Sequence, residues 1–243
     1  MTNRVALLLL LSGGLAGSAW AEDTMPVAGH WLMLVATKNL DPTHEAEFNH
    51  WYDDIDIPDV LKVPGYKRAR RGVRQTVTGF SAANREAADG RYVALYDIET
   101  PNMDRTIIDM LMAAKKMDMT GRSIEALKVT ERVYFRRLGG AVLVPNAAHK
   151  SGNGNTYLYL ERVACCRDEA TELALNDWYD NTHIPDIVGA GIEGLTRVER
   201  FEVYRVAMVE TLQVPRFLAL YEINADSADE VVEGLRKKTR QND

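Results

Sequence analysis

The stretch "NDWYDNTHIPD" at residues 176–186 has a close match elsewhere in this chain. Residues 49–59 read "NHWYDDIDIPD", so Trp-Tyr-Asp is followed by Ile-Pro-Asp at the same spacing, 127 residues earlier. Two more blocks recur in the same order: "GYKRARR" (65–71) matches "GLTRVER" (194–200), and "YVALYDI" (92–98) matches "FLALYEI" (217–223). Self-similarity at a nearly constant offset is the signature of a duplicated unit. The sequence therefore predicts two related halves.

The apolar pattern predicts similar elements in both halves. Strands are expected at 30–37, 66–77, 91–98 and 128–138 and then at 156–163, 195–206 and 216–223; helices are expected at 42–55, 102–117, 168–181 and 226–238. Asp41 and Pro42 suit the start of the first helix. Pro58 is expected to end it, because the residue before a proline disfavours helical geometry. The order β-α-β-β-α-β is ferredoxin-like.

The second half ends before a counterpart of the last strand. The run "GAVLVP" (140–145) is a candidate to take that strand's place. We expect a first ferredoxin-like unit at 22–145, a linker at 146–155 whose Gly and Asn content suits a flexible connection, and a second unit at 156–243.

The N-terminus predicts export. Arg4 precedes the short apolar run "VALLLLLS" (5–12), and "AWA" (19–21) is a small-x-small cleavage pattern. These features are typical of a signal peptide at 1–21, so we expect a secreted protein, periplasmic in a Gram-negative host. An uncleaved membrane anchor is the alternative. The run is shorter than a membrane span, and we expect no membrane association after cleavage.

The net charge and the cysteine content limit the kinds of molecule that this protein is expected to bind. Removing residues 1–21 takes away one basic and no acidic residue, which leaves 28 basic and 35 acidic residues and a net charge of −7. This balance argues against a nucleic-acid surface. Cys165 and Cys166 are the two cysteines, and they are adjacent. They can be two small strand-end residues, a vicinal disulfide or an intermolecular bridge. A homodimer of the whole chain stays open.

The motif "NDWYDNTHIPDIV" (176–188), followed by a glycine and then "TRVERF" (196–201), resembles the dimeric α/β-barrel superfamily and, within it, the EthD-like branch. In that superfamily two ferredoxin-like units, usually from two chains, pack their sheets into a barrel. The resemblance covers both halves and implies an α+β pseudo-dimeric barrel within one chain, with the second unit lacking its last strand. Members include lactone isomerases, cyclases, decarboxylases, cofactor-free oxygenases and haem enzymes. This chain departs from the motif at Asp56, where histidine is expected.

The motif residues suggest acid/base chemistry. Helical spacing places Asn176, Tyr179 and His183 on one stripe. His183 is expected at a helix C-terminus, where the dipole favours the imidazolium, and its side chain can exchange a proton near neutral pH. Tyr179 can orient it or donate to a developing oxyanion, and Arg200 and Tyr221 on the adjoining strands can bind a carboxylate or enolate. The catalytic candidates are thus His183, Tyr179, Asp56 and Arg200. The substrate-binding candidates are Asn176, Tyr52, Asn49, Arg71, Tyr221 and Tyr96.

Structural roles remain open for the same residues. His183 can bond only a carbonyl at the helix end, and Arg71 and Arg200 can pair with Asp59 and Asp186. The aromatic residues can be core, with Trp51 and Trp178 packed on the sheet. No metal site is expected from the five histidines. Haem is not expected either, because neither 102–117 nor 226–238 contains a histidine.

These observations favour a cofactor-free enzyme that performs isomerase, cyclase or lyase chemistry on a small aromatic or lactone-like molecule. This reading rests mainly on resemblance, and a fold alone does not fix a reaction. The alternative is a non-catalytic periplasmic protein that binds a small molecule in the same pocket, and a scaffold without a ligand is a third reading.

Overall fold

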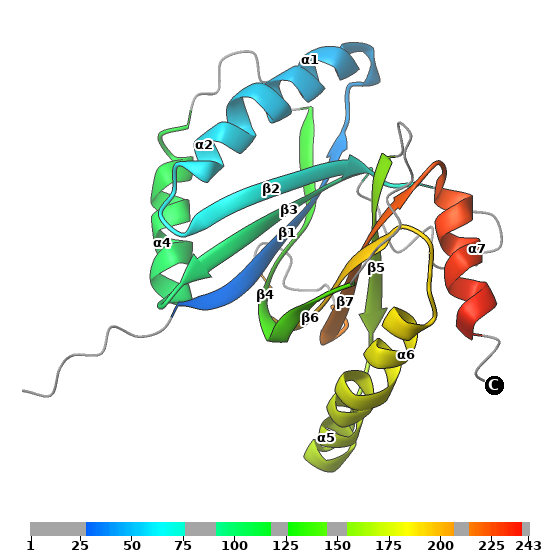
Figure 1. Cartoon of the computed structure of the whole chain (residues 1–243). Coiled ribbons are helices and arrows are strands. Elements are labelled where there is room, and N and C mark those ends of the chain that lie inside the picture. The colour runs from blue at the N-terminus through cyan, green and yellow to red at the C-terminus, as the bar shows by residue number, and fades with distance from the viewer. Residues whose placement is uncertain (1–27, 76–90, 118–125, 145–154, 207–213, 240–243) are drawn as a thin grey trace, which may run out of the picture.

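The computed structural model describes residues 28–75, 91–117, 126–144, 155–206 and 214–239 (Figure 1). The strands are β1 (Gly29–Asn39), β2 (Tyr66–Val73), β3 (Tyr92–Thr100), β4 (Leu127–Leu143), β5 (Asn155–Val163), β6 (Leu195–Val206) and β7 (Phe217–Ala225). The helical segments are η2 (Pro42–His44), α1 (Glu45–Trp51), η3 (Tyr52–Asp56), α2 (Ile57–Leu61), α4 (Met103–Ala114), α5 (Glu169–Trp178), η4 (Tyr179–His183), α6 (Ile184–Gly189) and α7 (Ala228–Thr239). Each expected element is found, with ends shifted by a few residues. The expected signal peptide lies outside the described residues, as does the expected linker except for Asn155.

All seven strands form one antiparallel sheet in the order β2-β3-β1-β4-β6-β7-β5. We call residues 28–144 the first half and residues 155–239 the second half. The β4–β6 pair joins them, with Phe135 opposite Val203 and Arg137 opposite Phe201. The chain is therefore a mixed α/β protein with one continuous sheet across both halves.

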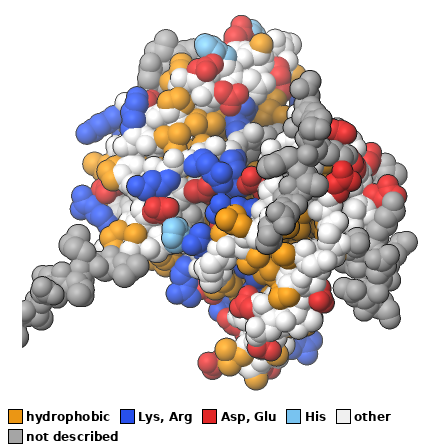
Figure 2. Space-filling view, in the orientation of Figure 1, with side chains coloured by type: hydrophobic (Ala, Val, Ile, Leu, Met, Phe, Trp, Pro, Cys, Tyr) orange, Lys and Arg blue, Asp and Glu red, His pale blue; other side chains and the backbone are white. Residues whose placement is uncertain are grey.

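The sheet curls. β2 is one edge and β7 lies next to the other edge, yet Arg70 on β2 forms an ion pair of 3.3 Å with Glu222 on β7. Arg70 also binds Asp97 on the neighbouring β3. In Figure 2, Lys and Arg side chains lie interleaved with Asp and Glu side chains between the two halves. A curled antiparallel sheet of this kind agrees with a dimeric α/β-barrel-like fold.

Alternation along the strands builds two faces. On β1, Met33 and Val35 belong to a cluster with the helices of the first half, and a separate cluster lies against α6 and α7 in the second half. Leu32 and Leu34 point to the opposite face, where a third cluster draws on strands of both halves, with Phe135 among its buried members. The described helices thus cover one face of the sheet, and strand side chains fill the other.

The helix that carries the motif does not end at its proline, contrary to the expectation. In each half an α-helix passes through a five-residue π-helical turn, where the Ile57 N–H donates to the Tyr52 carbonyl and the Ile184 N–H to the Tyr179 carbonyl. Pro58 then lies in the first turn of α2, and the second half does the same with α6. The wider turn shifts the hydrogen-bond ladder, so the missing proline N–H lies where a new helix begins and is tolerated.

The run 140–145 does not take the place of the missing strand. Residues 140–143 continue β4, and Val142 lies opposite Val198 of β6. Gly139 has a φ of +62°, and the register shifts between Leu138 and Val142. A glycine in the left-handed region permits such a bulge, which lets one long strand follow the curl. In the described residues β5 therefore forms an edge of the sheet.

No helix in the described part of the chain is long and apolar enough to cross a membrane.

Candidate functional site

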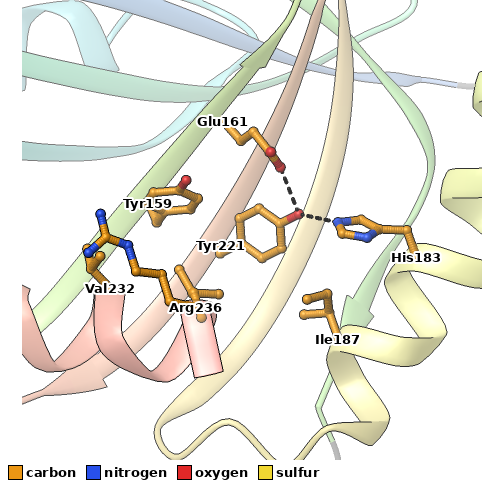
Figure 3. A pocket seen from close by; sticks show the side chains of 8 residues that line it. Tyr159, Glu161, His183, Ile187, Tyr221, Val232 and Arg236 are labelled. Atoms are coloured by element: carbon orange, nitrogen blue, oxygen red, sulfur yellow. Dashed lines mark hydrogen bonds between the residues drawn. The ribbon is translucent and has the colours of Figure 1, made fainter. Parts of the chain in front are cut away.

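A pocket of about 120 Å³ lies between the sheet and the helices of the second half (Figure 3). It is bounded by β5 and β7 on the sheet side and by η4, α6 and α7 on the helix side. Its polar lining is Tyr159, Glu161, His183, Tyr221 and Arg236, and its apolar lining is Ile187, Val232 and Leu235. A small number of polar groups within a largely apolar lining is the usual composition of a small-molecule site.

His183 lies inside a continuous helical segment rather than at a helix C-terminus. It is the last residue of η4, and α6 follows directly. The helix-dipole argument for an imidazolium therefore fails, since that effect acts only at a helix end. Burial lowers the pKa of His183 below its ordinary value, and Arg200 adds to this, while the carboxylates of Glu161 and Asp186 act in the opposite direction. The ring is thus held as neutral imidazole at neutral pH.

Tyr221 connects His183 to Glu161. Its hydroxyl lies 3.3 Å from Glu161 Oε2 and 3.4 Å from His183 Nε2 (Figure 3). The strand β7 places Tyr221 beside β5, where Tyr159 is its direct partner, and Ile184 and Ile187 of α6 pack in the same core cluster as Tyr221. Residues distant in sequence thereby form a chain of three polar groups, carboxylate to phenol to imidazole.

Tyr159 and Tyr221 of the pocket, and Tyr179 beside His183, are proton donors. Burial, followed by the charge of Glu161, raises the pKa of Tyr179 to about 12, and the same two causes raise the pKa of Tyr221 far above its ordinary value. Burial also raises the pKa of Tyr159. A phenol that stays protonated at neutral pH can donate a hydrogen bond to Glu161. The half-buried carboxylate of Glu161 therefore has a protonated phenol, Tyr221, as a hydrogen-bond donor.

Arg200 is tied to the motif helix and is not among the residues that line the pocket. Its guanidinium donates to Asn176 Oδ1 at 2.6 Å and to Asp180 Oδ1 at 2.7 Å, and it lies 4.4 Å from the centre of the Tyr179 ring. Only 4% of its side chain is exposed. Asp180, rather than Asp186, is the ion-pair partner. We call these four residues the second-half clamp, and it holds the helix against β6.

The first half contains the same clamp. Arg71 donates to Asn49 Oδ1 at 2.8 Å and to Asp53 Oδ1 at 2.9 Å, and its guanidinium lies 4.4 Å from the Tyr52 ring centre. The partner of Arg71 is thus Asp53 and not Asp59, which pairs with Lys62. The sequence candidates Asn49, Tyr52 and Arg71 therefore come together, as do Asn176, Tyr179 and Arg200, but as packing groups beside the sheet.

Two polar residues that line the pocket on β5 have apolar residues at the equivalent positions of the first half. Tyr221 corresponds to Tyr96, and the strand partner of Tyr96 is Met33 where that of Tyr221 is Tyr159. Two residues along, Val35 stands where the second half has Glu161. Met33 and Val35 are 2% and 4% exposed and belong to the first-half core. Burial raises the pKa of Tyr52 to about 12 and that of Tyr96 well above its ordinary value.

Asp56 occupies the position of His183 in the first half. It is the last residue of η3, as His183 is of η4. Its half-buried carboxylate is near enough to Tyr52 and Tyr96 to raise the pKa of both. The His183 and Asp56 candidates therefore occupy equivalent backbone positions, with unlike neighbours.

The two tryptophans of the motif differ. Trp51 is buried and packs in the first-half core, as expected. Trp178 was expected to pack on the sheet, but 45% of it is exposed, and its ring stacks on His183 at 4.5 Å with an interplanar angle of 23°. In a π-helical turn residues five apart lie above one another, which brings position 178 over position 183.

Sequence reasoning missed Glu161, Tyr159 and Arg236. A signal for the first two was present in the duplication: once β5 is aligned with β1 through their partner strands, polar Tyr159 and Glu161 replace apolar Met33 and Val35. Arg236 lies on α7 with no repeated motif to mark it. Cys165 and Cys166, in the segment between β5 and α5, are joined by a disulfide in the structure.

Within the described ranges, no group of three or more His, Cys, Asp or Glu side chains is placed to hold a metal ion.

The chain matches no described protein family and no curated protein. Among solved structures it is similar to an anthrone oxidase-like protein, with 13% identity, a TM-score of 0.49, and coverage of 88% of this chain and 80% of that one. It is also similar to a variant of chlorite dismutase from Candidatus Nitrospira defluvii, with 10% identity, a TM-score of 0.47, and coverage of 88% of this chain and 83% of that one. Likenesses at this level say nothing about the chemistry of the pocket.

Proposed function

We propose that the chain is an enzyme that moves a proton on a small aromatic or lactone-like molecule, with His183 as the acid/base. The observation that carries the proposal is the Glu161–Tyr221–His183 chain at the wall of a largely apolar pocket. A neutral imidazole beside protonated phenols can accept a proton and return it. Isomerisation, cyclisation and elimination all use this step.

The hydrogen-bond chain suggests which nitrogen is the base. A carboxylate only accepts hydrogen bonds, so the single Tyr221 proton points to Glu161. The Tyr221 oxygen then accepts a hydrogen bond from the N–H group at His183 Nε2. This arrangement leaves the lone pair on Nδ1, and the Glu161 charge stabilises the imidazolium that forms when Nδ1 takes a proton. The geometry therefore supports Nδ1 as the acceptor and Tyr221 as the group that fixes the tautomer.

Pocket size favours a ligand with one ring. A dry cavity of about 150 Å³ is large enough to bind benzene in another protein, and this pocket holds about 120 Å³ and opens to solvent. The Tyr159 and Tyr221 rings, whose centres lie 5.7 Å apart, offer aromatic surface. Ile187 and Val232 add aliphatic surface. These walls suit a flat apolar body with one polar group at the His183 end.

The proposal includes a single working site. The first half has the clamp and the Asp56 carboxylate, but Met33 and Val35 fill the positions of Tyr159 and Glu161. Without a carboxylate at position 35 there is no counterpart of the polar chain, so we expect no proton transfer there.

Solvent-deuterium exchange tests the proposal without a known substrate. Small enolisable aromatic ketones and unsaturated lactones are incubated with the protein in D₂O, and loss of the α-proton signal is followed by NMR. We expect exchange that His183→Gln slows by about 10²- to 10⁴-fold, the usual contribution of a general base. Asp56→Asn is the matched control and should leave the rate unchanged. Compounds that bind without exchange would favour the non-catalytic binding protein, whereas exchange at a rate indifferent to His183→Gln would remove His183 as the acid/base.

The cofactor-free part of the proposal has its own test. We expect the purified protein to show only the protein band in its absorbance spectrum. A Soret band would overturn this part and assign a haem to the chain, whereas the exchange assay would still decide the role of His183.

The finer evolutionary and cellular assignments are also proposals. The orders β2-β3-β1-β4 and β6-β7-β5 support two ferredoxin-like units fused in one chain, and the sequence motif supports the EthD-like branch. The N-terminal sequence supports export. A mature N-terminus at Glu22, read by mass spectrometry of the protein from its native compartment, is the expected result; an intact Met1 would contradict export by cleavage.

A further inference from the structure

Trp178 departs from the rule that large aromatic residues are buried. Its repeat counterpart Trp51 is 3% exposed, whereas Trp178 is 45% exposed. Both follow the same kind of α-helix and precede the same π-helical turn, so the backbone does not explain the difference. The exposure of Trp178 therefore needs an explanation other than backbone geometry, and the contacts of its ring provide one.

The indole covers one face of the His183 ring. The two ring centres lie 4.5 Å apart with an interplanar angle of 23°, which is a stacked arrangement. Tyr179 meets the same imidazole edge-on, at 5.0 Å and 80°, and the Tyr221 hydroxyl meets Nε2. His183 is therefore bounded on three sides. Rotation of the imidazole out of its plane about the Cβ–Cγ bond would break the stack, so the stack fixes the plane of the ring, and within that plane the contact with the Tyr221 hydroxyl selects the orientation that directs Nε2 toward it.

The equivalent positions in the first half, Trp51 and Asp56, provide a comparison for the Trp178–His183 stack. The η3 turn brings position 51 and position 56 together as η4 does for 178 and 183, but Asp56 offers no ring to stack upon. There Trp51 packs into the core instead. The exposed tryptophan thus coincides with the half that has the histidine, the Glu161 carboxylate and the pocket.

We propose that Trp178 is a positioning residue of the His183 site: its exposed indole holds the imidazole by stacking in the orientation in which Nε2 meets the Tyr221 hydroxyl. The inference rests on the proposed function only in that His183 is the group being positioned. Trp178 itself is not among the pocket-lining residues and takes no proton. It acts by restricting the ring that does.

The test compares Trp178→Ala, Trp178→Phe and the control Leu173→Ala in otherwise intact protein. Leu173 is an apolar residue on the same helix and is 62% exposed, so its loss reports on general effects of trimming that surface. The readout is the ¹⁵N chemical shifts of the His183 ring, which distinguish the two neutral tautomers, followed across a pH titration. The other charged or titratable groups around His183 are Glu161, Asp186, Arg200, Tyr179 and Tyr221, and all are unchanged in these variants.

Trp178→Ala should convert a single His183 tautomer into a mixture and raise the pH at which the ring titrates, because the ring then gains solvent. Trp178→Phe should keep the wild-type tautomer, and Leu173→Ala should match wild type. Unchanged shifts in Trp178→Ala, or a Phe variant that behaves like the Ala variant, would overturn the proposal.

A second readout separates this inference from the proposed function. If exchange activity is found, Trp178→Ala should lower kcat by about three- to ten-fold with little change in KM, the range expected for one aromatic contact. If no activity is found, the tautomer measurement still stands, because it needs no substrate. Failure of the proposed function and failure of the positioning role are therefore distinct results.

Discussion

The two halves of the chain share a scaffold and differ in what it encloses. Each half clamps its motif helix to the sheet through one arginine, Arg71 or Arg200, held by an asparagine, an aspartate and a tyrosine ring. Behind the clamp, the first half contains buried Met33 and Val35, and the second contains Tyr159 and Glu161 beside a pocket.

This difference separates the part of the repeated motif that maintains the fold from the part that supports chemistry. The repeated residues, Trp-Tyr-Asp and Ile-Pro-Asp, maintain the helix and its clamp. The residues that are not repeated, His183 and Glu161, form the polar chain. The shared motif therefore supplies a similar frame in both halves, while Tyr159 and Glu161 stand where the first half has two apolar core residues, and they line a pocket. Such a site is expected to reduce stability in exchange for function.

The largest expected effect comes from exchanging the carboxylate between halves. Val35→Glu places a carboxylate in the first-half core, where it must be protonated or exposed, and should reduce the free energy of unfolding by about 4 kcal/mol or more at neutral pH. Glu161→Val should change it by no more than about 1 kcal/mol, because Glu161 is only half-buried and its replacement leaves no unpaired buried charge. Urea unfolding curves of both variants provide the measurement. Equal losses in the two would show that the halves are not packed differently at this position.

Truncation of the two motif tryptophans should reduce the free energy of unfolding by clearly different amounts. Trp51→Ala leaves a large void in the first-half core and should cost about 3–5 kcal/mol. Trp178→Ala removes a half-exposed ring and one stack, so about 1–2 kcal/mol is expected. Thermal and urea unfolding of the two proteins measure the difference. A loss for Trp178→Ala that matches Trp51→Ala would contradict the surface position of Trp178.

The clamps, by contrast, should be equivalent. Arg71→Met and Arg200→Met each remove a buried guanidinium with its amide and ring contacts, for an expected loss of about 1–3 kcal/mol. The ion-pair component adds little, since the partner side chains Asp53 and Asp180 are 52% and 59% exposed. The two losses should agree within about 1 kcal/mol. A clear inequality in urea unfolding would break the equivalence of the halves at the one place where their contacts coincide.

The smallest effect is the pH dependence that His183 adds. Burial lowers its pKa in the folded protein, so the unfolded chain binds the proton more readily. Stability from this group is therefore complete above the ordinary histidine pKa of about 6.5 and falls as pH drops from there toward the lowered folded pKa. His183→Gln should flatten this part of the stability–pH profile, whereas Asp56→Asn should leave its slope between pH 6.5 and 5 unaltered. An unchanged slope in His183→Gln would show that the imidazole is not desolvated.

Much of the fold follows from local sequence patterns. Strand alternation and helical spacing predicted each element of the sheet and its helices, because both periods depend on neighbouring residues alone. The helix end at Pro58 was predicted wrongly, because a π-helical turn upstream removes the conflict between proline and helix. The run after Leu138 was also predicted wrongly: strand pairing is a long-range property, and Gly139 allowed β4 to continue along β6.

The candidate site was predictable only in part. His183 and Tyr221 were found because they lie in or next to repeated motifs, and the structure places both at the pocket. Glu161 was not predicted, because a glutamate on a strand of mixed polarity has no sequence motif around it that indicates a function. Arg200 looked like a substrate ligand in the sequence, but its charge is used within the clamp.

By itself, the sequence of this protein determined the recurring motifs, the order of elements and the position of a histidine that one copy of the motif has and the other lacks. The tertiary structure alone decided that Glu161, His183 and Tyr221 meet, although 60 residues separate the first from the last and 38 separate the last two. Strand register and the packing of Ile184 and Ile187 of α6 in the second-half core create that meeting. Both are set by packing among residues far apart in the chain, which no local pattern encodes.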